Sequence, residues 1–398
     1  MANKKDWKTR LIHSDAEVPE GFRSLATPVY RGSTVLFTRA AAATDQWNQH
    51  EVGYTYGLYG TPTNLELAAK VCELEKGFHT IITPGGQSAI SLIHLALLKS
   101  GDHVLLPESI YGPNRMFSND VLRRFGVEVT YYPPLPDAQE RRGNGVGGIG
   151  PFLKSNTRLV WCESPGSITM EVQDVPAIAE AAHRHGALVV LDNTWAAGIY
   201  FDAFAHGVDV TMQALTKYVG GHSDLLLGSI TVRDQKIYER LGETHQGLGF
   251  AASPDDCSLA LRGMKSMAVR LKAVEQSALE LARWLAARPE VELVLHPALP
   301  ACPGHEFFQR DFTGSTGLFS IVLAKRYSRE QVHAFVDALK LFKIGYSWGG
   351  VTSLVMTYDL QSPKRPKYDH RIVRLYTGLE DFSDLKADME QAFAAIPI

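Results

Sequence analysis

The chain has 398 residues, 45% of them hydrophobic and 21% charged, values typical of a globular protein of two or three domains. Its net charge of −3 does not favour binding to nucleic acid or to an anionic membrane surface. No long apolar run predicts a membrane span, and the basic N-terminus lacks the apolar stretch of a secretory signal. The four cysteines are widely separated, which matches neither a zinc site nor a redox pair, so we expect a cytoplasmic protein without a bound metal.

The N-terminal part of the chain differs in texture from the rest. Residues 1–60 are rich in Pro, Gly, Tyr and Thr, show no sustained period, and predict an extended arm. From residue 61 to 256, helical segments alternate with seven short apolar runs, which is typical of a mostly parallel α/β sheet flanked by helices. The predicted strands are 79–83, 103–107, 127–132, 157–162, 187–192, 209–215 and 225–232.

A long helical pattern over 255–288 precedes a second region, which we expect to form a smaller C-terminal α/β domain from 257 to 398. Its predicted strands are 317–323 and 371–376, and its predicted helices are 328–341 and 380–395.

The run "GNGVGG" at 143–148 has the glycine spacing of a dinucleotide-binding loop. It follows a polar segment in place of a strand and does not open a helix. We therefore interpret it as a flexible connection, which argues against a nicotinamide-dependent oxidoreductase.

A lysine stands directly after an apolar run in "QALTKYVGGHSD" (213–224) and is followed by two glycines. One interpretation of Lys217 is a side chain whose stem lies along apolar surface and whose amine reaches water. The other is an amine held in a pocket to form a Schiff base with a carbonyl.

Asp192 ends the preceding apolar run, "ALVVLD". By itself it could be a turn or helix-capping carboxylate. Because Asp192 and Lys217 follow successive strands of one sheet, we expect them near the same edge. Pyridoxal phosphate requires both: a lysine for its aldehyde and an acid that keeps its ring nitrogen protonated.

The segment "TPGGQSAISLIHLALL" (83–98) reads as a strand, a glycine turn and a helix whose first amides could bind a phosphate. Gly86 and Gln87 are the expected donors, aided by the hydroxyl of Thr216; the alternative is an ordinary turn. Tyr111 follows another strand and could stack on a cofactor ring, or simply pack at an interface.

Three segments, "LDNTWAAG" (191–198), "QALTKYVGGHSD" and "ESPGSITMEVQD" (163–174), closely resemble the cysteine/methionine-metabolism family of pyridoxal-phosphate (PLP) enzymes. The family includes cystathionine β-lyases, γ-lyases and γ-synthases. The resemblance implies the fold-type-I PLP-dependent transferase fold. It also implies a catalytic role for Lys217 and Tyr111 and a cofactor-binding set of Lys217, Asp192, Gly86, Gln87, Thr216, Tyr111 and Tyr56.

Two further motifs extend the resemblance. "YTYGLYGTPT" (54–63) matches a segment that crosses into a neighbouring subunit's site with Tyr56, and "VRLYTGLED" (373–381) matches the segment whose arginine, Arg374, binds the substrate carboxylate. The alternative for Arg374 is a charge at the surface edge of a strand, and the alternative for Trp348 is a side chain that packs in the core. Leu58 and Thr352 depart from the family, standing where many members have an arginine and a glutamate.

"YSWGGVTSL" (346–354) bears on the type of reaction, because its tryptophan is similar to that of bacterial cystathionine β-lyases. The implied substrate-binding residues are Arg374, Trp348, Ser347 and Tyr56.

The resemblance implies a homotetramer, a dimer of dimers with shared sites, that cleaves cystathionine to homocysteine, pyruvate and ammonia in methionine biosynthesis. A γ-lyase or γ-synthase, or a broader cysteine-S-conjugate β-lyase, is the alternative within the family. A non-catalytic protein on the same fold is disfavoured by the intact Lys217 and Asp192.

Overall fold

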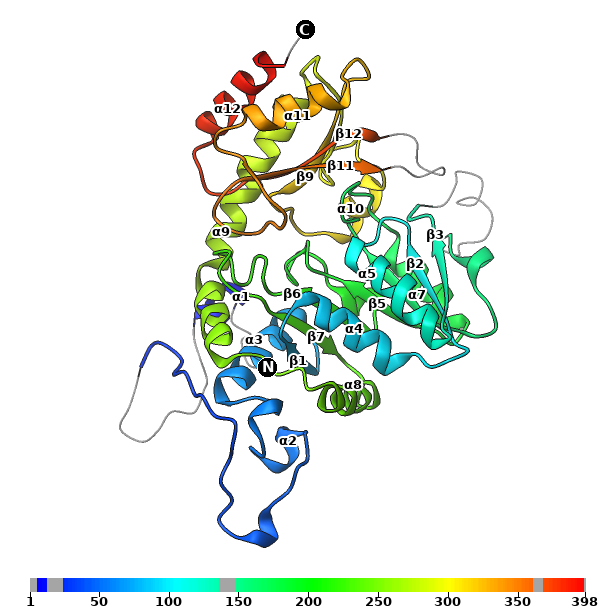
Figure 1. Cartoon of the computed structure of the whole chain (residues 1–398), viewed down its shortest axis with the longest axis vertical. Coiled ribbons are helices and arrows are strands. Elements are labelled where there is room, and N and C mark those ends of the chain that lie inside the picture. The colour runs from blue at the N-terminus through cyan, green and yellow to red at the C-terminus, as the bar shows by residue number, and fades with distance from the viewer. Residues whose placement is uncertain (1–5, 13–23, 136–147, 361–367, 397–398) are drawn as a thin grey trace.

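The computed structural model describes residues 6–12, 24–135, 148–360 and 368–396. These residues build two sheets, with the second stacked above the first in Figure 1. The first sheet has seven strands in the order β1-β7-β6-β5-β4-β2-β3, and β7 alone runs antiparallel to its neighbours. This confirms the predicted mostly parallel sheet. Its strands are β1 (His79–Thr83), β2 (His103–Pro107), β3 (Glu128–Tyr132), β4 (Thr157–Glu163), β5 (Leu188–Asp192), β6 (Val210–Ala214) and β7 (Gly228–Val232).

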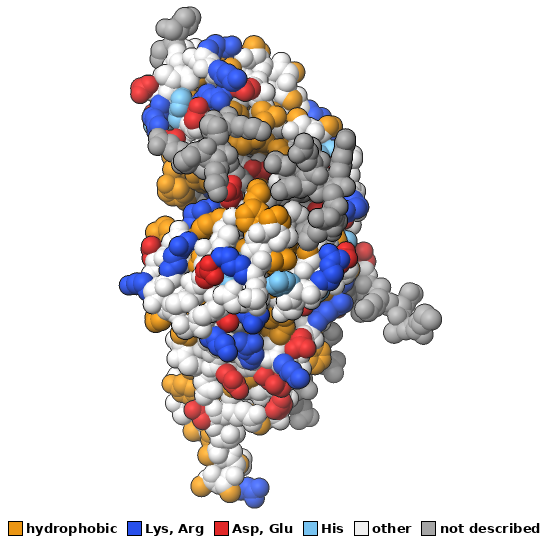
Figure 2. Space-filling model, turned by 90° about the vertical axis from the view of Figure 1, so that its right-hand side faces the viewer, with side chains coloured by type: hydrophobic (Ala, Val, Ile, Leu, Met, Phe, Trp, Pro, Cys, Tyr) orange, Lys and Arg blue, Asp and Glu red, His pale blue; other side chains and the backbone are white. Residues whose placement is uncertain are grey.

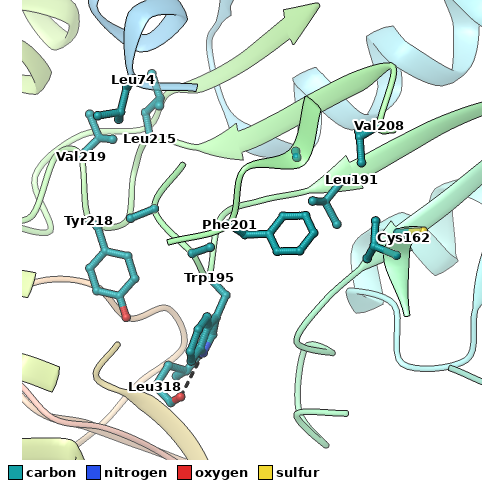
Figure 3. Packing of buried hydrophobic residues seen from close by; sticks show 14 of the residues in the cluster. Leu74, Cys162, Leu191, Trp195, Phe201, Val208, Leu215, Tyr218, Val219 and Leu318 are labelled. Atoms are coloured by element: carbon teal, nitrogen blue, oxygen red, sulfur yellow. Dashed lines mark hydrogen bonds between the residues drawn. The ribbon is translucent and has the colours of Figure 1, made fainter. Parts of the chain in front are cut away.

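Both faces of this sheet are buried, which explains why its strands are apolar almost throughout. Along β5, Val189 and Leu191 belong to one hydrophobic core and Val190 to the other, as alternation along a strand requires. Figure 3 shows the first of these cores around Leu191. The helices in this part are α3 (Pro62–Glu75), α4 (Gly86–Leu97), α5 (Gly112–Phe117), α7 (Val175–Arg184) and α8 (Gln235–Leu248).

The second sheet has the order β10-β11-β12-β9-β8; α9 and α11 pack on its strands, and α12 packs against these two helices and shares their hydrophobic core. It forms the smaller α/β unit that the sequence predicts, but three of its five strands, β8, β10 and β11, were not predicted. Its elements are β8 (Val291–Leu295), β9 (Leu318–Leu323), β10 (Lys343–Ile344), β11 (Leu354–Leu360), β12 (Asp369–Tyr376), α10 (His305–Asp311), α11 (Arg329–Ala338) and α12 (Phe382–Ala394).

Helix α9 (Pro254–Ala286) is shared between the two parts. Its residues from Cys257 to Val274 enter the core of the large sheet, whereas those from Ala278 to Leu285 enter the core of the second sheet. The expected boundary at 256/257 falls in the first turn of this helix, so the division into 61–256 and 257–398 stays a prediction. Trp195 adds a link between the parts, because its Nε1 donates to the carbonyl of Leu318 over 3.1 Å (Figure 3).

The N-terminal segment is less uniform than the predicted arm. Helix α1 (Trp7–Ile12) packs on α9 because Trp7 and Leu11, four residues apart, lie on one helical face. The arm itself contains α2 (Gln49–Val52) and extends away from the second sheet (Figure 1). The remaining short helical turns are Ala40–Ala42, Gly57–Tyr59, Ser118–Leu122, Arg123–Phe125, Gly150–Phe152 and Ala203–His206.

The described surface carries charges of both signs. On the face in Figure 2, basic and acidic side chains are interspersed with no broad patch of one sign among the coloured residues. This distribution gives no electrostatic footprint for nucleic acid on that face. None of the helices within the described ranges is long and apolar enough to cross a membrane.

Candidate active site

Polar side chains gather where the parallel strands of the large sheet end. β4 ends at Glu163 and β5 at Asp192, and these two residues are register partners. Lys217 lies in the turn that follows β6, three residues beyond its last residue, Ala214. Because β4, β5 and β6 are parallel neighbours, their carboxyl ends bring all three side chains to one edge.

The amine of Lys217 is held by a segment from the second part of the chain. Its Nζ donates a 2.5 Å hydrogen bond to Oγ of Ser347 and lies 5.2 Å from the ring centre of Trp348. Burial, and then the nearby positive charge of Arg374, lower the pKa of Lys217 to about 8, while Asp192 acts in the opposite direction. At a given pH near neutrality, a larger fraction of this amine is therefore neutral than for a lysine in water.

The backbone between β10 and β11 is shaped for this contact. Ser347 has φ of 82° and Gly349 has φ of 89°, both in the left-handed region. A Cβ on Gly349 would lie 2.8 Å from the carbonyl carbon of Lys217, so only glycine fits there. Trp348 packs on Tyr218, with ring centres 5.3 Å apart. The loop thus closes directly over the lysine.

Asp192 is buried and only partly saturated. Its Oδ1 accepts hydrogen bonds from the amide of Thr194 at 3.0 Å and from the Thr194 hydroxyl at 2.5 Å. Its Oδ2 has no hydrogen bond within the described parts of the chain. Burial raises the pKa of Asp192, and the Thr194 hydrogen bonds and the charge of Lys217 counteract it. A cationic ring N–H could use the free oxygen.

Helix α4 begins at Gly86, with two residues between it and the end of β1, and its first turn lies against the end of β6. A Cβ on Gly86 would come within 2.8 Å of the Ala214 Cβ, so the close approach depends on glycine. Oε1 of Gln87 is buried with no partner in the described chain. The hydroxyl of Thr216 lies 3.2 Å from both the amide and the carbonyl of Leu227, so binding a phosphate would require it to turn.

These residues fit pyridoxal phosphate. The helix N-terminus suits a phosphate, the free carboxylate oxygen suits a protonated pyridine nitrogen, and the lysine of lowered pKa suits an aldehyde. The close approach at Gly86 brings the first amides of α4 to the end of β6, next to the turn that carries Lys217.

Arg374 lies on β12 and faces the same region. Its side chain is buried, with the whole residue 8% exposed, and burial lowers its pKa. Among the described residues, its guanidinium has neither a hydrogen bond nor an ion pair; the ring of Tyr358 is 5.1 Å from its Cζ. A buried cation without an anion is costly, so this geometry favours a ligand carboxylate over a surface charge.

The sequence did not single out Glu163, which belongs to this cluster. Its Oε2 accepts the amide of Tyr111 over 2.7 Å, at the start of α5, and Tyr111 itself is 40% exposed at the edge of the site. Burial, and then the charge of Asp192, raise the pKa of Glu163 well above its ordinary value. The sequence could have indicated Glu163 by its position, because it ends β4 just as Asp192 ends β5.

Tyr56 and Leu58 lie on the arm and do not join the cluster around Lys217 within this chain. Tyr56 is 45% exposed. Leu58 lines a cavity of about 50 Å³ with Trp47 and Tyr238 of its own chain. The expected crossing of this segment into a neighbouring subunit's site stays a prediction. The glycine run 143–148 lies outside the described residues except for Gly148.

The fold and this cluster define a PLP-dependent enzyme of the parallel-sheet type. The chain belongs to the family described as Cys/Met metabolism PLP-dependent enzymes, whose model matches residues 8–394. A putative cystathionine beta-lyase of Rhizobium johnstonii is 44% identical, over 97% of this chain and 96% of its own. The cystathionine beta-lyase MetC of Escherichia coli is 38% identical over all of both chains. The crystal structure of metB from Corynebacterium glutamicum is 30% identical, superposes with a TM-score of 0.86, and is matched over 98% of each chain.

Proposed function

We propose that this enzyme catalyses the α,β-elimination of cystathionine, giving homocysteine, pyruvate and ammonia. The observation that carries the proposal is that a buried Lys217 amine, of pKa about 8, shares the site with Arg374, whose guanidinium has no ion pair among the described residues. One group suits proton transfer at Cα and the other suits the α-carboxylate of an amino acid. The relatives named cystathionine beta-lyase support the choice of substrate.

Bound PLP supplies an electron sink for the negative charge that develops at Cα. Arg374 holds the substrate carboxylate through the edge of its guanidinium. The neutral amine of Lys217 accepts the Cα proton, and the resulting ammonium returns a proton to the departing sulfur. Elimination needs both transfers, and one lysine of pKa near neutrality serves both.

The neighbouring groups would set the geometry of these transfers. Ser347 holds Nζ of Lys217, and Trp348 excludes water beside it. Asp192, through its free oxygen, would keep the pyridine nitrogen protonated. Gly86, Gln87 and Thr216 would receive the phosphate. Tyr111 would stack on the ring, held by the carboxylate of Glu163 beneath its amide.

We further propose a cytoplasmic homotetramer in which Tyr56 reaches the site of a neighbouring subunit. The exposure of Tyr56 on an extended arm supports this arrangement. The four cysteines, all free thiols, suit a reducing compartment.

The decisive experiment is to incubate the purified protein with PLP and cystathionine and identify the keto acid. Pyruvate is expected, because breaking the bond between Cβ and sulfur leaves a keto acid of three carbons. If 2-oxobutyrate predominates, the enzyme catalyses a γ-elimination and the proposed β-elimination is wrong. A parallel assay with other cysteine S-conjugates ranks the substrates by kcat/KM, and Lys217→Ala serves as the inactive control.

A further inference from the structure

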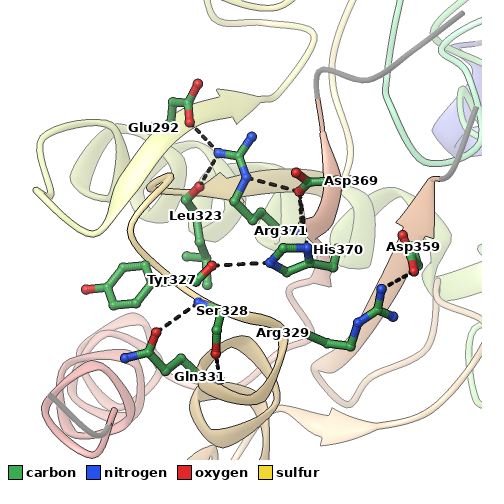
Figure 4. Close-up of polar contacts among 10 residues, drawn as sticks. All are labelled: Glu292, Leu323, Tyr327, Ser328, Arg329, Gln331, Asp359, Asp369, His370 and Arg371. Carbon is green, nitrogen blue, oxygen red and sulfur yellow. Dashed lines mark hydrogen bonds and ion pairs between the residues drawn. The ribbon is translucent and has the colours of Figure 1, made fainter. Parts of the chain in front are cut away.

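Two arginines on β12 have opposite surroundings although both are buried. Arg371 is 5% exposed and Arg374 is 8% exposed. Arg371 donates to Glu292, to Asp369 over 3.0 Å and to the carbonyl of Leu323 over 2.9 Å, as Figure 4 shows. Arg374 has no such acceptor in the described chain. Arg371 is therefore fixed by its own protein, whereas Arg374 needs something else to hold it.

The contact that Arg374 does make is with an aromatic face. Its Cζ lies 5.1 Å from the ring centre of Tyr358 on β11. The register explains this contact, since Arg374 pairs with Met356 and Tyr358 lies two residues beyond Met356 on the same face. Diagonal neighbours across an antiparallel pair are within reach of long side chains. A cation above a ring within about 6 Å is attracted by its quadrupole.

The strands that carry this pair are anchored from the side. Arg329 of α11 forms an ion pair with Asp359, the residue after Tyr358 (Figure 4). On β12, the Nε2 of His370 contacts the carbonyl of Tyr327 over 3.2 Å. The β11–β12 ladder itself sets the backbone positions of Tyr358 and Arg374, and these two contacts hold the same strands at their far ends.

We propose that Tyr358 is a positioning residue for substrate recognition: its ring fixes the plane of the Arg374 guanidinium so that the N–H edge faces the incoming carboxylate. This inference rests on the proposed role of Arg374. The N–H donors of a guanidinium lie in its plane, so the proposal places the face of the guanidinium on the ring and its edge toward the carboxylate for a two-point contact. Without the ring, the guanidinium would lose the cation–π contact that it makes within the described chain, and the two-point geometry would be sampled less often.

The contact uses the face of the Tyr358 ring and not its hydroxyl. The Tyr358 hydroxyl has no hydrogen bond within the described residues. Phenylalanine therefore preserves the proposed function of this side chain, while leucine keeps an apolar group of moderate size but removes the aromatic face. The two variants form a matched pair.

The test measures ligand binding to the PLP-loaded enzyme and does not depend on elimination. Dissociation constants for glycine, which has a carboxylate but no leaving group, and for methylamine, which lacks the carboxylate, are read from the cofactor absorbance. We expect Tyr358→Leu to weaken glycine binding about 3- to 30-fold, the range of a partly buried cation–π contact. Methylamine binding should be unchanged, and Tyr358→Phe should bind glycine within about twofold of the original enzyme.

A second measurement ties the effect to Arg374. In an Arg374→Ala background, Tyr358→Leu should cause no further loss of glycine affinity, because the group that it positions is gone. An equal loss for glycine and methylamine, a full effect in the Arg374→Ala background, or no effect in Tyr358→Leu would each overturn the proposal. Failure of the proposed function looks different: the original enzyme would bind glycine normally but release no pyruvate from cystathionine.

Discussion

The Nζ of Lys217 and the Oγ of Ser347 are joined by a 2.5 Å hydrogen bond across 130 residues of sequence. This bond ties the turn after β6 to the loop between β10 and β11, and so connects the two parts of the chain at the reacting amine. It also places the hydroxyl of Ser347 where it can hold the lysine in one rotamer while the amine gains and loses a proton. The strained φ of 82° at Ser347 is consistent with a functional demand on this residue.

Removing this hydroxyl should slow catalysis more than it affects folding. Ser347→Ala should lower kcat/KM about tenfold, the effect of losing one hydrogen bond of roughly 1–1.5 kcal/mol. Ser347→Gly loses the same hydroxyl but relieves the left-handed strain, so it should melt at a higher temperature than Ser347→Ala at a similar kcat/KM. Steady-state kinetics and thermal denaturation check both. Full activity in either variant would show that the bond does not serve the amine.

The lowered pKa of Lys217 should be visible in the rate at which PLP reattaches to the apoenzyme. Only the neutral amine attacks an aldehyde, so the rate should rise with pH and level off about one unit above a pKa of about 8. An ordinary lysine would give a rate that keeps rising through about pH 10. Rapid-mixing absorbance over this pH range distinguishes the two. If the rate does not level off below pH 10, the buried amine keeps an ordinary pKa and the prediction is wrong.

The Thr194 hydroxyl should stabilise Asp192 and the start of the Lys217 turn together. It donates to Oδ1 of Asp192 at 2.5 Å and accepts the amide of Ala214 at 3.0 Å. Thr194→Val keeps the shape, leaves the amide of Ala214 without this acceptor and removes one of the two hydrogen bonds to Oδ1 of Asp192, which should cost about 1–3 kcal/mol of unfolding free energy and speed PLP loss. Thr194→Ser keeps the hydroxyl and should remain close to the original in urea denaturation and in dialysis against buffer. If Val and Ser behave alike, the hydroxyl contributes nothing.

The large sheet could be predicted because its strands are buried on both faces and alternate with helices, a pattern that is local in sequence. β8, β10 and β11 could not, because they are short or carry polar residues such as Glu292 and Asp359, which obscure the apolar pattern of a strand. Strand ends indicated Lys217 and Asp192 for the same local reason. Glu163 was overlooked beside them, although it occupies the equivalent position on β4.

The contacts between the two parts of the chain were beyond the sequence. The bond between Lys217 and Ser347 depends on how the loop before β11 meets the large sheet, and the contact of Tyr358 with Arg374 depends on the register of β11 and β12. The family resemblance named Ser347 and Arg374 but gave no reason to choose Tyr358. Such contacts follow from register and from packing between elements, neither of which a local pattern contains.

Two glycines at the start of α4, Gly85 before its first turn and Gly86 at its first residue, should differ sharply in their tolerance of a methyl group. A Cβ on Gly86 would lie 2.8 Å from the Ala214 Cβ and push the helix N-terminus away from the end of β6. A Cβ on Gly85 would find nothing closer than the Ser88 hydroxyl at 3.9 Å, and its φ of 176° is extended backbone that any residue adopts. Gly86→Ala should therefore weaken PLP binding about tenfold or more, through loss of aligned amide donors to the phosphate.

Gly85→Ala, by contrast, should keep the cofactor with nearly the original affinity. Equilibrium dialysis of both variants, together with circular dichroism to confirm that α4 is folded, gives the comparison. Because alanine is the better helix former, Gly86→Ala should not reduce helicity, and a loss of cofactor without a loss of helix would locate the effect at the phosphate. Equal PLP affinity in the two variants would mean that the amides at the start of α4 do not bind the phosphate, and the anion site would have to be sought elsewhere.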